Sequence, residues 1–266
     1  MRSLSVLDFG SSSTMYKKIL TASFLFLSTA AYVHAEEESA THTISGNIGL
    51  VSKYIYRGGV ENNDLAIQGG LGYTHKSGFL AEYWGSTLDY DSSDDSKTRG
   101  FESDFYIGYG RDLTEDLSVS TKLAAYFYHR GGSVYNEDRS EKRRTTGTEW
   151  LAEVDYKNLA VSMAVALSDV NYGNAGDVYL SAGYSYDLPY DFALNTLVGV
   201  NIFNSSQDDS LVETSKDLVF NEARLGLSKS FPDVGVDMTL DYIWGGKDRV
   251  NDRFDDHLVF GVSYSF

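Results

Sequence analysis

The chain has 266 residues, of which 38 are acidic and 22 basic, and its formal net charge is −16. Such acidity argues against nucleic acid as a partner and against docking on an anionic membrane surface, since both need basic patches. The chain has no cysteine, which excludes disulfide scaffolds, thiol nucleophiles and cysteine-ligated zinc. It also lacks the run of about 18 apolar residues that would predict a membrane-spanning helix.

The first 35 residues have the features of a secretory signal peptide. Two lysines precede an apolar run at 19–33, and a small-x-small cleavage site ends at Ala35. We expect cleavage after Ala35, and translation from Met15, because the residues before it resemble a spurious upstream extension. Residues 36–266 then form one domain.

Twelve segments of about ten residues follow, the length that a tilted β-strand needs to cross a bilayer. This pattern predicts an all-β fold, a transmembrane antiparallel up-and-down barrel of about 12 strands with both termini in the periplasm. The segments lie at 44–57, 64–74, 79–90, 100–110, 117–129, 147–156, 159–169, 176–187, 192–203, 217–230, 234–244 and 256–266.

The seventh segment shows the alternation most clearly. The side chains at its odd-numbered positions, from Leu159 to Leu167, are apolar and point to one side of an extended strand. The side chains at its even-numbered positions, from Ala160 to Ser168, are small and point to the other side. The eleventh segment, 234–244, alternates in the same way. One face therefore suits lipid and the other suits water, as in a transmembrane barrel.

The connections differ by parity. After each even-numbered segment the link is short, whereas after odd-numbered segments it is usually longer and more polar, the longest being 130–146. Short periplasmic turns alternating with longer outer loops are typical of bacterial outer-membrane barrels. The sequence leaves open whether 130–146 folds inward.

Aromatic side chains are expected at both membrane interfaces, where amphipathic rings lie at the level of the headgroups. We expect an inner girdle that includes Tyr73, Tyr109, Tyr156, Tyr186 and Phe266. We expect an outer girdle that includes Tyr54, Tyr56, Phe127, Trp150, Tyr242 and Trp244.

The last segment ends with an aromatic residue, Phe266, after a strand that alternates apolar and small or polar residues. This ending resembles the C-terminal signal that the barrel assembly machinery reads. The alternative is an edge strand of a soluble sandwich, but such a fold gives no reason for loops to be sorted by parity.

The first mature segment, 45–59, together with Gly69-Gly70, Trp84-Gly85 and Gly108-Tyr109, resembles the TorF family of porins. That family is also described as a conserved Gcw-type outer-membrane family of unknown function. The specific part of the resemblance covers about residues 44–110. It implies an outer-membrane channel and supplies no catalytic residues.

If the apolar side chains face lipid, the charged side chains of the strands face the lumen, because Lys or Arg facing lipid near the midplane costs about 2–4 kcal/mol. Nine acids against four bases predict a negative lumen, and carboxylates in a pore favour cations. The pore-lining candidates are Lys53, Arg57, Glu82, Glu102, Asp104, Lys122, Glu149, Glu153, Asp155, Glu222, Arg224, Asp237 and Asp241.

The same charges allow a second interpretation, in which they neutralise one another across a narrow barrel. Lys53 or Arg57 would then pair with Glu82 or Glu102, and Arg224 would pair with neighbours of Glu222. A barrel of eight strands is filled by its own side chains and one of 16 to 18 leaves a channel. Twelve strands fall between these cases.

Two other classes of function compete with a channel. An outer-membrane enzyme would need a nucleophile beside an oriented base, and neither His129 nor His257 has a serine in such a context. A barrel that acts through its outer loops could bind a ligand or a cation, or adhere to a surface. The acidic runs 89–95 and 252–256 lack EF-hand spacing, so we predict neither a metal site nor a cofactor.

The sequence therefore predicts a porin-like channel in the bacterial outer membrane for passive diffusion of small polar solutes or ions, with a mild preference for cations. It is not predicted to be an enzyme. Its expected partners are outer-membrane lipid and lipopolysaccharide, the barrel assembly machinery through Phe266, and the diffusing solutes; nucleic acid is not among them.

Overall fold

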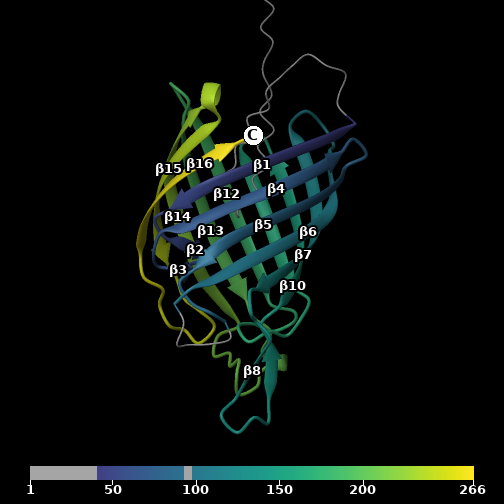
Figure 1. Ribbon diagram of the computed structural model, residues 1–266, viewed down its shortest axis with the longest axis vertical. Coiled ribbons are helices and arrows are strands. Elements are labelled where there is room, and N and C mark those ends of the chain that lie inside the picture. Colours follow the sequence, from purple (N-terminus) through teal and green to yellow (C-terminus); the bar gives the residue numbers. More distant parts are fainter. Residues whose placement is uncertain (1–40, 93–97) are drawn as a thin grey trace, which may run out of the picture.

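The computed structural model describes residues 41–92 and 98–266, which form a closed antiparallel barrel of twelve strands (Figure 1). Each strand pairs with the next along the chain, and the last strand pairs with the first. The predicted all-β antiparallel barrel of about twelve strands is thus confirmed, the predicted periplasmic position of both termini stays a prediction, and the predicted signal peptide lies outside the described residues. The wall strands are β1 (His42–Val51), β4 (Ala66–His75), β5 (Phe79–Leu88), β6 (Gly100–Asp112), β7 (Leu117–Tyr128), β10 (Gly147–Tyr156), β11 (Leu159–Ala166), β12 (Val178–Leu188), β13 (Phe192–Ile202), β14 (Leu218–Phe231), β15 (Val236–Gly245) and β16 (His257–Ser265).

Each predicted segment corresponds to one wall strand, but the seventh was extended to 169, whereas β11 ends at Ala166, and two other boundaries were wrong as well. The first segment was extended to 57, whereas β1 ends at Val51. The eleventh was begun at 234, whereas a 3-10 turn occupies Pro232–Val234 and β15 starts after Gly235 in a left-handed conformation. In both places an apolar or aromatic run continued the alternation past the point where the chain turns.

The two faces of the wall have the expected chemistry. Along β11, Val161 is 46% exposed while its neighbour Ala160 is 6% exposed. Along β6, Phe105 is 50% exposed while Asp104 is fully buried. Exposed apolar side chains thus cover the outside of the barrel, and charged and polar side chains of the strands point to its inside.

Most of the predicted girdle aromatics point outward from the wall. Tyr109, Tyr156, Tyr186 and Phe266 are exposed near one end of the barrel, and Phe127, Trp150, Tyr242 and Trp244 are exposed near the other. The prediction was wrong for Tyr54 and Tyr56, which follow the end of β1; Tyr54 is only 5% exposed. Both belong to a hairpin that leaves the wall.

The connections are sorted as predicted. The short links, such as the two residues between β10 and β11, share one end of the barrel with the start of β1 and the end of β16. The long links share the other end, where loops and a projecting hairpin extend from the wall (Figure 1). That projecting hairpin consists of β8 (Ser133–Tyr135) and β9 (Lys142–Arg144), so the segment 130–146 extends away from the barrel.

Among the described residues, no helix is both long enough and apolar enough to cross a membrane.

The turn at Gly78 depends on the absence of a side chain. Gly78 has a φ of 99°, and a Cβ placed there would lie 2.5 Å from the carbonyl oxygen of Gly110. We expect Gly78→Ala to lower the free energy of unfolding by about 1–3 kcal/mol, because a non-glycine residue is strained in this region of φ. Gly132→Ala is the control, since nothing lies within 4 Å of its added Cβ. Equal urea midpoints for the two variants refolded in lipid would contradict this expectation.

Candidate functional site

The lumen of the barrel carries most of the predicted pore-lining residues. Lys53 and Arg57 instead lie in the link between β1 and β4, off the wall. The other eleven lie in wall strands, in alternation with the exposed apolar positions: Glu82, Glu102, Asp104, Lys122, Glu149, Glu153, Asp155, Glu222, Arg224, Asp237 and Asp241.

The link between β1 and β4 folds into a small hairpin of β2 (Tyr54–Tyr56) and β3 (Gly59–Asn62). Tyr56 pairs with Gly59 around Arg57 and Gly58, whose φ angles are 46° and 79°. Two positive φ angles in a two-residue connection are the geometry of a type I′ turn, which suits a tight hairpin. The tip of the hairpin therefore presents the Arg57 side chain.

One side of the hairpin contacts the wall formed by β5 and β6. The ring of Tyr54 packs edge-on against Trp84 with centroids 5.4 Å apart, and its hydroxyl donates to Glu102 at 3.2 Å. Asn62 donates from Nδ2 to the carbonyl of Thr87 at 2.8 Å. The hairpin is thus fastened to this wall by packing and by hydrogen bonds.

The other side of the hairpin contacts the opposite wall. Ile55 packs in a cluster with Ile243 and Val259, and Arg224 donates to the carbonyl of Ile55 at 3.3 Å. Arg224 lies on β14, six positions around the twelve-stranded barrel from β6, which carries the Glu102 contact. The hairpin therefore crosses the lumen at the end that carries the long loops.

Arg57 completes the crossing, because it reaches strands on the far side from β1. Its guanidinium donates to both carboxylate oxygens of Glu149, at 2.7 and 2.8 Å, and Tyr126 donates to the same carboxylate at 2.8 Å. The guanidinium carbon lies 4.7 Å from the ring centroids of both Tyr56 and Tyr179. We refer to Glu149, Tyr126, Tyr56 and Tyr179 as the Arg57 clamp.

The predicted charge pairs formed with different partners. Arg57 pairs with Glu149 rather than with Glu82 or Glu102, because the hairpin carries it across the lumen. Lys53 contacts the side chain of Asn63. Glu82 pairs with Lys122 at 2.8 Å, deeper in the barrel, and Arg224 pairs with Glu222 at 2.6 Å.

Two acids beneath the hairpin have no basic partner among the described ion pairs. Glu102 and Asp104 are 4% and 0% exposed, and they accept hydrogen bonds from the hydroxyls of Tyr54 and Tyr106. The second oxygen of Asp104 is buried and accepts no hydrogen bond. This part of the lumen therefore places two carboxylates beside the side chains of two tyrosines.

Towards the short-turn end, the lumen holds Glu153, Asp155 and Asp237. Ser118 donates to Asp155 at 3.3 Å, and Ser230 donates to Asp237 at 2.5 Å. Among residues 41–92 and 98–266, no group of three or more His, Asp or Glu side chains is placed to hold a metal ion.

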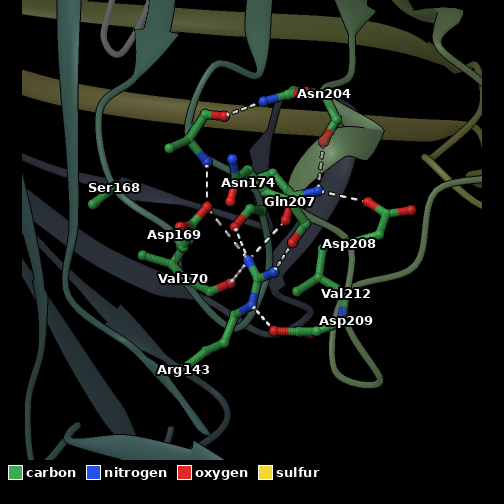
Figure 2. Close-up of polar contacts among 12 residues, drawn as sticks. Arg143, Ser168, Asp169, Val170, Asn174, Asn204, Gln207, Asp208, Asp209 and Val212 are labelled. Carbon is green, nitrogen blue, oxygen red and sulfur yellow. Dashed lines mark hydrogen bonds and ion pairs between the residues drawn. The ribbon is translucent and has the colours of Figure 1, made fainter. Parts of the chain in front are cut away.

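At the end of the barrel that carries the long loops, the buried side chain of Arg143 ties these loops together (Figure 2). Arg143 pairs with Asp209 at 2.6 Å and donates to Asn174 at 2.7 Å, and it also reaches backbone carbonyls of two loops, including that of Gly173 at 3.1 Å. Asn174 donates in turn to Asp208 at 2.7 Å. A single guanidinium thus joins the loops after β7, β11 and β13.

This network predicts that the loops loosen in acid. Burial acts to raise the pKa of Asp209, but hydrogen bonds from Arg143 and from the N–H groups of Leu211 and Val212 outweigh it and hold the pKa below its ordinary value. Such a group stabilises the fold above its unfolded pKa of about 3.9, and the contribution is lost as the pH falls through the lowered folded pKa. Pepsin cleavage of the loops should therefore increase steeply below about pH 4.

Asp209→Asn is the control for this prediction, because it removes the titrating group and keeps the size of the side chain. The variant should show a flatter dependence of cleavage on pH. Asp208, whose pKa is also lowered, since hydrogen bonds from Thr214 and Asn174 outweigh the effect of burial, accounts for the remainder. An unchanged pH profile in Asp209→Asn would contradict a role of Asp209 in holding the loops.

Sequence reasoning missed the hairpin and the Arg143 network. The signal for the hairpin was present in Arg57-Gly58-Gly59 and in the polar run that follows, since glycine pairs punctuate strands. No comparable signal marks Arg143, whose partners come from loops distant in sequence.

A model of a family described as "Bacterial protein of unknown function (Gcw_chp)" matches residues 35–266. No curated protein matches the chain.

Solved structures of similar shape include the KdgM porin, with 8% sequence identity, coverage of 84% of this chain and 99% of that chain, and a TM-score of 0.50. A structure described as KdgM porin in complex with disordered oligogalacturonate gives 10% identity, coverage of 84% and 98%, and a TM-score of 0.46. OpdL of Pseudomonas aeruginosa has 14% sequence identity, coverage of 85% of this chain and 68% of that chain, and a TM-score of 0.40. At these identities the likeness concerns the fold alone.

Proposed function

The chain belongs to the Gcw_chp family of bacterial proteins of unknown function, and we propose that it is an outer-membrane channel through which small polar solutes or ions diffuse passively. One observation carries this proposal: the twelve-stranded wall is closed, apolar on its outside and charged on its inside. Such a wall satisfies its backbone hydrogen bonds within lipid and leaves a polar interior for solutes.

The proposed channel prefers cations mildly. Nine of the thirteen predicted lumen charges are acidic, and the Arg57–Glu149, Lys122–Glu82 and Arg224–Glu222 pairs neutralise equal numbers of each sign. The remaining excess is negative, and a ring of carboxylates lowers the free energy of cations in a pore.

The proposed location is the bacterial outer membrane, with both termini in the periplasm and the long loops facing lipopolysaccharide. The sorting of long and short links between the two ends supports this orientation. Phe266, whose backbone pairs with Gly46 at 2.9 Å across the closing seam, is the proposed contact for the barrel assembly machinery. The narrower resemblance to TorF porins stays a prediction.

A barrel that does not conduct and acts through its outer loops is the second candidate. Two observations favour it: the β2–β3 hairpin contacts opposite walls of the lumen, and Arg143 ties three loops into one surface (Figure 2). In this case the loops would bind a ligand or a cation, or mediate adhesion. Neither candidate assigns a catalytic step to the chain.

Conductance of the refolded mature protein in a planar bilayer under a KCl gradient separates the two candidates. The channel predicts discrete current steps and a reversal potential of the sign expected for cations. Silence from a protein whose folding is verified by circular dichroism and by heat-modifiable migration in gels would overturn the channel and favour the loop surface.

A further inference from the structure

The Arg57 clamp is built like a binding site that already has an occupant. A planar guanidinium lies over two tyrosine rings, with its carbon 4.7 Å from each centroid, and donates two hydrogen bonds to the carboxylate of Glu149. Its side chain is only 20% exposed and that of Glu149 only 13%. Two parallel hydrogen bonds read the fork of a guanidinium, and ring faces attract its charge.

The backbone at this position disfavours the residue that it carries. Arg57 has a φ of 46° at the first central position of a type I′ turn, where Asn, Asp and Gly are preferred. Residues in the left-handed region concentrate at ligand clamps and switch segments, where the surroundings hold them. Lys157, in the two-residue turn between β10 and β11, also has a positive φ, of 55°. What distinguishes Arg57 is therefore the set of side chains that holds it, rather than its backbone conformation alone.

We infer that the clamp is a subsite for guanidinium-bearing cations, and that Arg57 is a tethered occupant which such a solute displaces. This inference rests on the proposed channel function and names the class of solute that the lumen recognises. Glu149 would accept two hydrogen bonds from the incoming guanidinium, and the ring of Tyr179 would contact that guanidinium as it now contacts Arg57. Tyr126 would continue to donate its hydrogen bond to Glu149. Displacement of Arg57 releases the tip of the hairpin from the far wall.

The surroundings of the clamp suit the passage of such a cation. Glu102 and Asp104 lie on the next part of the inner wall, beside the rings of Tyr106 and Tyr126, which are 6.3 Å apart. A short tether gives a side chain an effective concentration in the millimolar range, so a solute competes at concentrations of about that order. Weak binding of this kind is compatible with flux, because a solute must also leave its site.

The test uses Arg57→Asn, which removes the guanidinium and places at this position a residue that type I′ turns favour. In a bilayer containing this variant, about 10 mM methylguanidinium should lower the KCl current by more than half, because it refills the clamp. Methylammonium, which has the charge without the fork, should have a much smaller effect, and neutral methylurea none. Arg57→Gly suits the positive φ equally and is the second variant if the first does not refold.

Two double variants locate the effect. Arg57→Asn with Glu149→Gln should lose the response to methylguanidinium, whereas Arg57→Asn with Glu137→Gln, on the exposed tip of β8–β9, should retain it. A conducting Arg57→Asn channel that ignores methylguanidinium, or responds equally to methylammonium, would overturn the inference and leave the channel intact. Absence of current from both folded wild type and variant would instead overturn the proposed function.

Discussion

Removal of the β2–β3 hairpin is expected to raise the single-channel conductance several-fold. Val51 and Ala66 are register partners at the ends of β1 and β4, so a short Gly-Asn-Gly-Ser turn can replace residues 52–65 without moving the wall. The hairpin fastens to β6 on one side of the lumen and to β14 on the other, and its removal clears the part of the lumen that it crosses. Conductance steps in symmetrical KCl measure the change.

The control shortens a hairpin that does not enter the lumen. Replacement of residues 137–140, at the exposed tip between β8 and β9, by two glycines removes chain from the loop end and leaves the wall and the β2–β3 hairpin in place. This variant should conduct as wild type does. If the two shortened proteins have the same conductance, the β2–β3 hairpin is not the constriction.

Neutralisation of lumen acids should weaken the preference for cations. The triple variant Glu102→Gln, Asp104→Asn, Glu153→Gln replaces three carboxylates on the inner face of β6 and β10. The free energy of a cation in the pore rises when these charges are removed, whereas that of an anion falls. The reversal potential under a KCl gradient should therefore move towards zero.

An equal change of net charge outside the lumen controls for surface effects. Glu137→Gln, Glu213→Gln and Asp233→Asn lie at exposed positions of loops and turns and should leave the reversal potential unchanged in about 0.1 M salt, where the Debye length is about 10 Å. If the triple variant in the lumen shifts the reversal potential no more than this triple variant on the surface does, the charges in the lumen do not select ions.

The wall was predictable because its determinants are local. In β11 the side chains alternate through eight residues, so the sequence alone identifies which of Val161 and Ala160 faces outward. The lengths of the links then assign the two ends of the barrel. Twelve such decisions, each made within about ten residues, are sufficient for the strand order, because an up-and-down barrel pairs neighbours along the chain.

The hairpin was not predictable by the same reasoning. Tyr54, Ile55 and Tyr56 favour extended backbone equally in a wall strand and in a small hairpin, so the period of two continued past the true end of β1. The clamp depends on this decision, because Arg57 and Glu149 are 92 residues apart and meet only when the link folds inward. The Arg143 network has the same origin, since its geometry is set by three loops at once.

The most direct test of the account is whether solutes pass along the predicted inner face. The chain has no cysteine, so single cysteines can be introduced without background. Ser162 points to the inside of the barrel, where its hydroxyl oxygen lies 2.6 Å from that of Ser181 on the neighbouring strand. In the variant Ser162→Cys, a cationic thiol reagent should reduce the current in discrete steps. At Val161→Cys, on the outside of the barrel, it should have no effect. Equal sensitivity at the two positions, or none at Ser162→Cys in a conducting channel, would contradict conduction through the barrel.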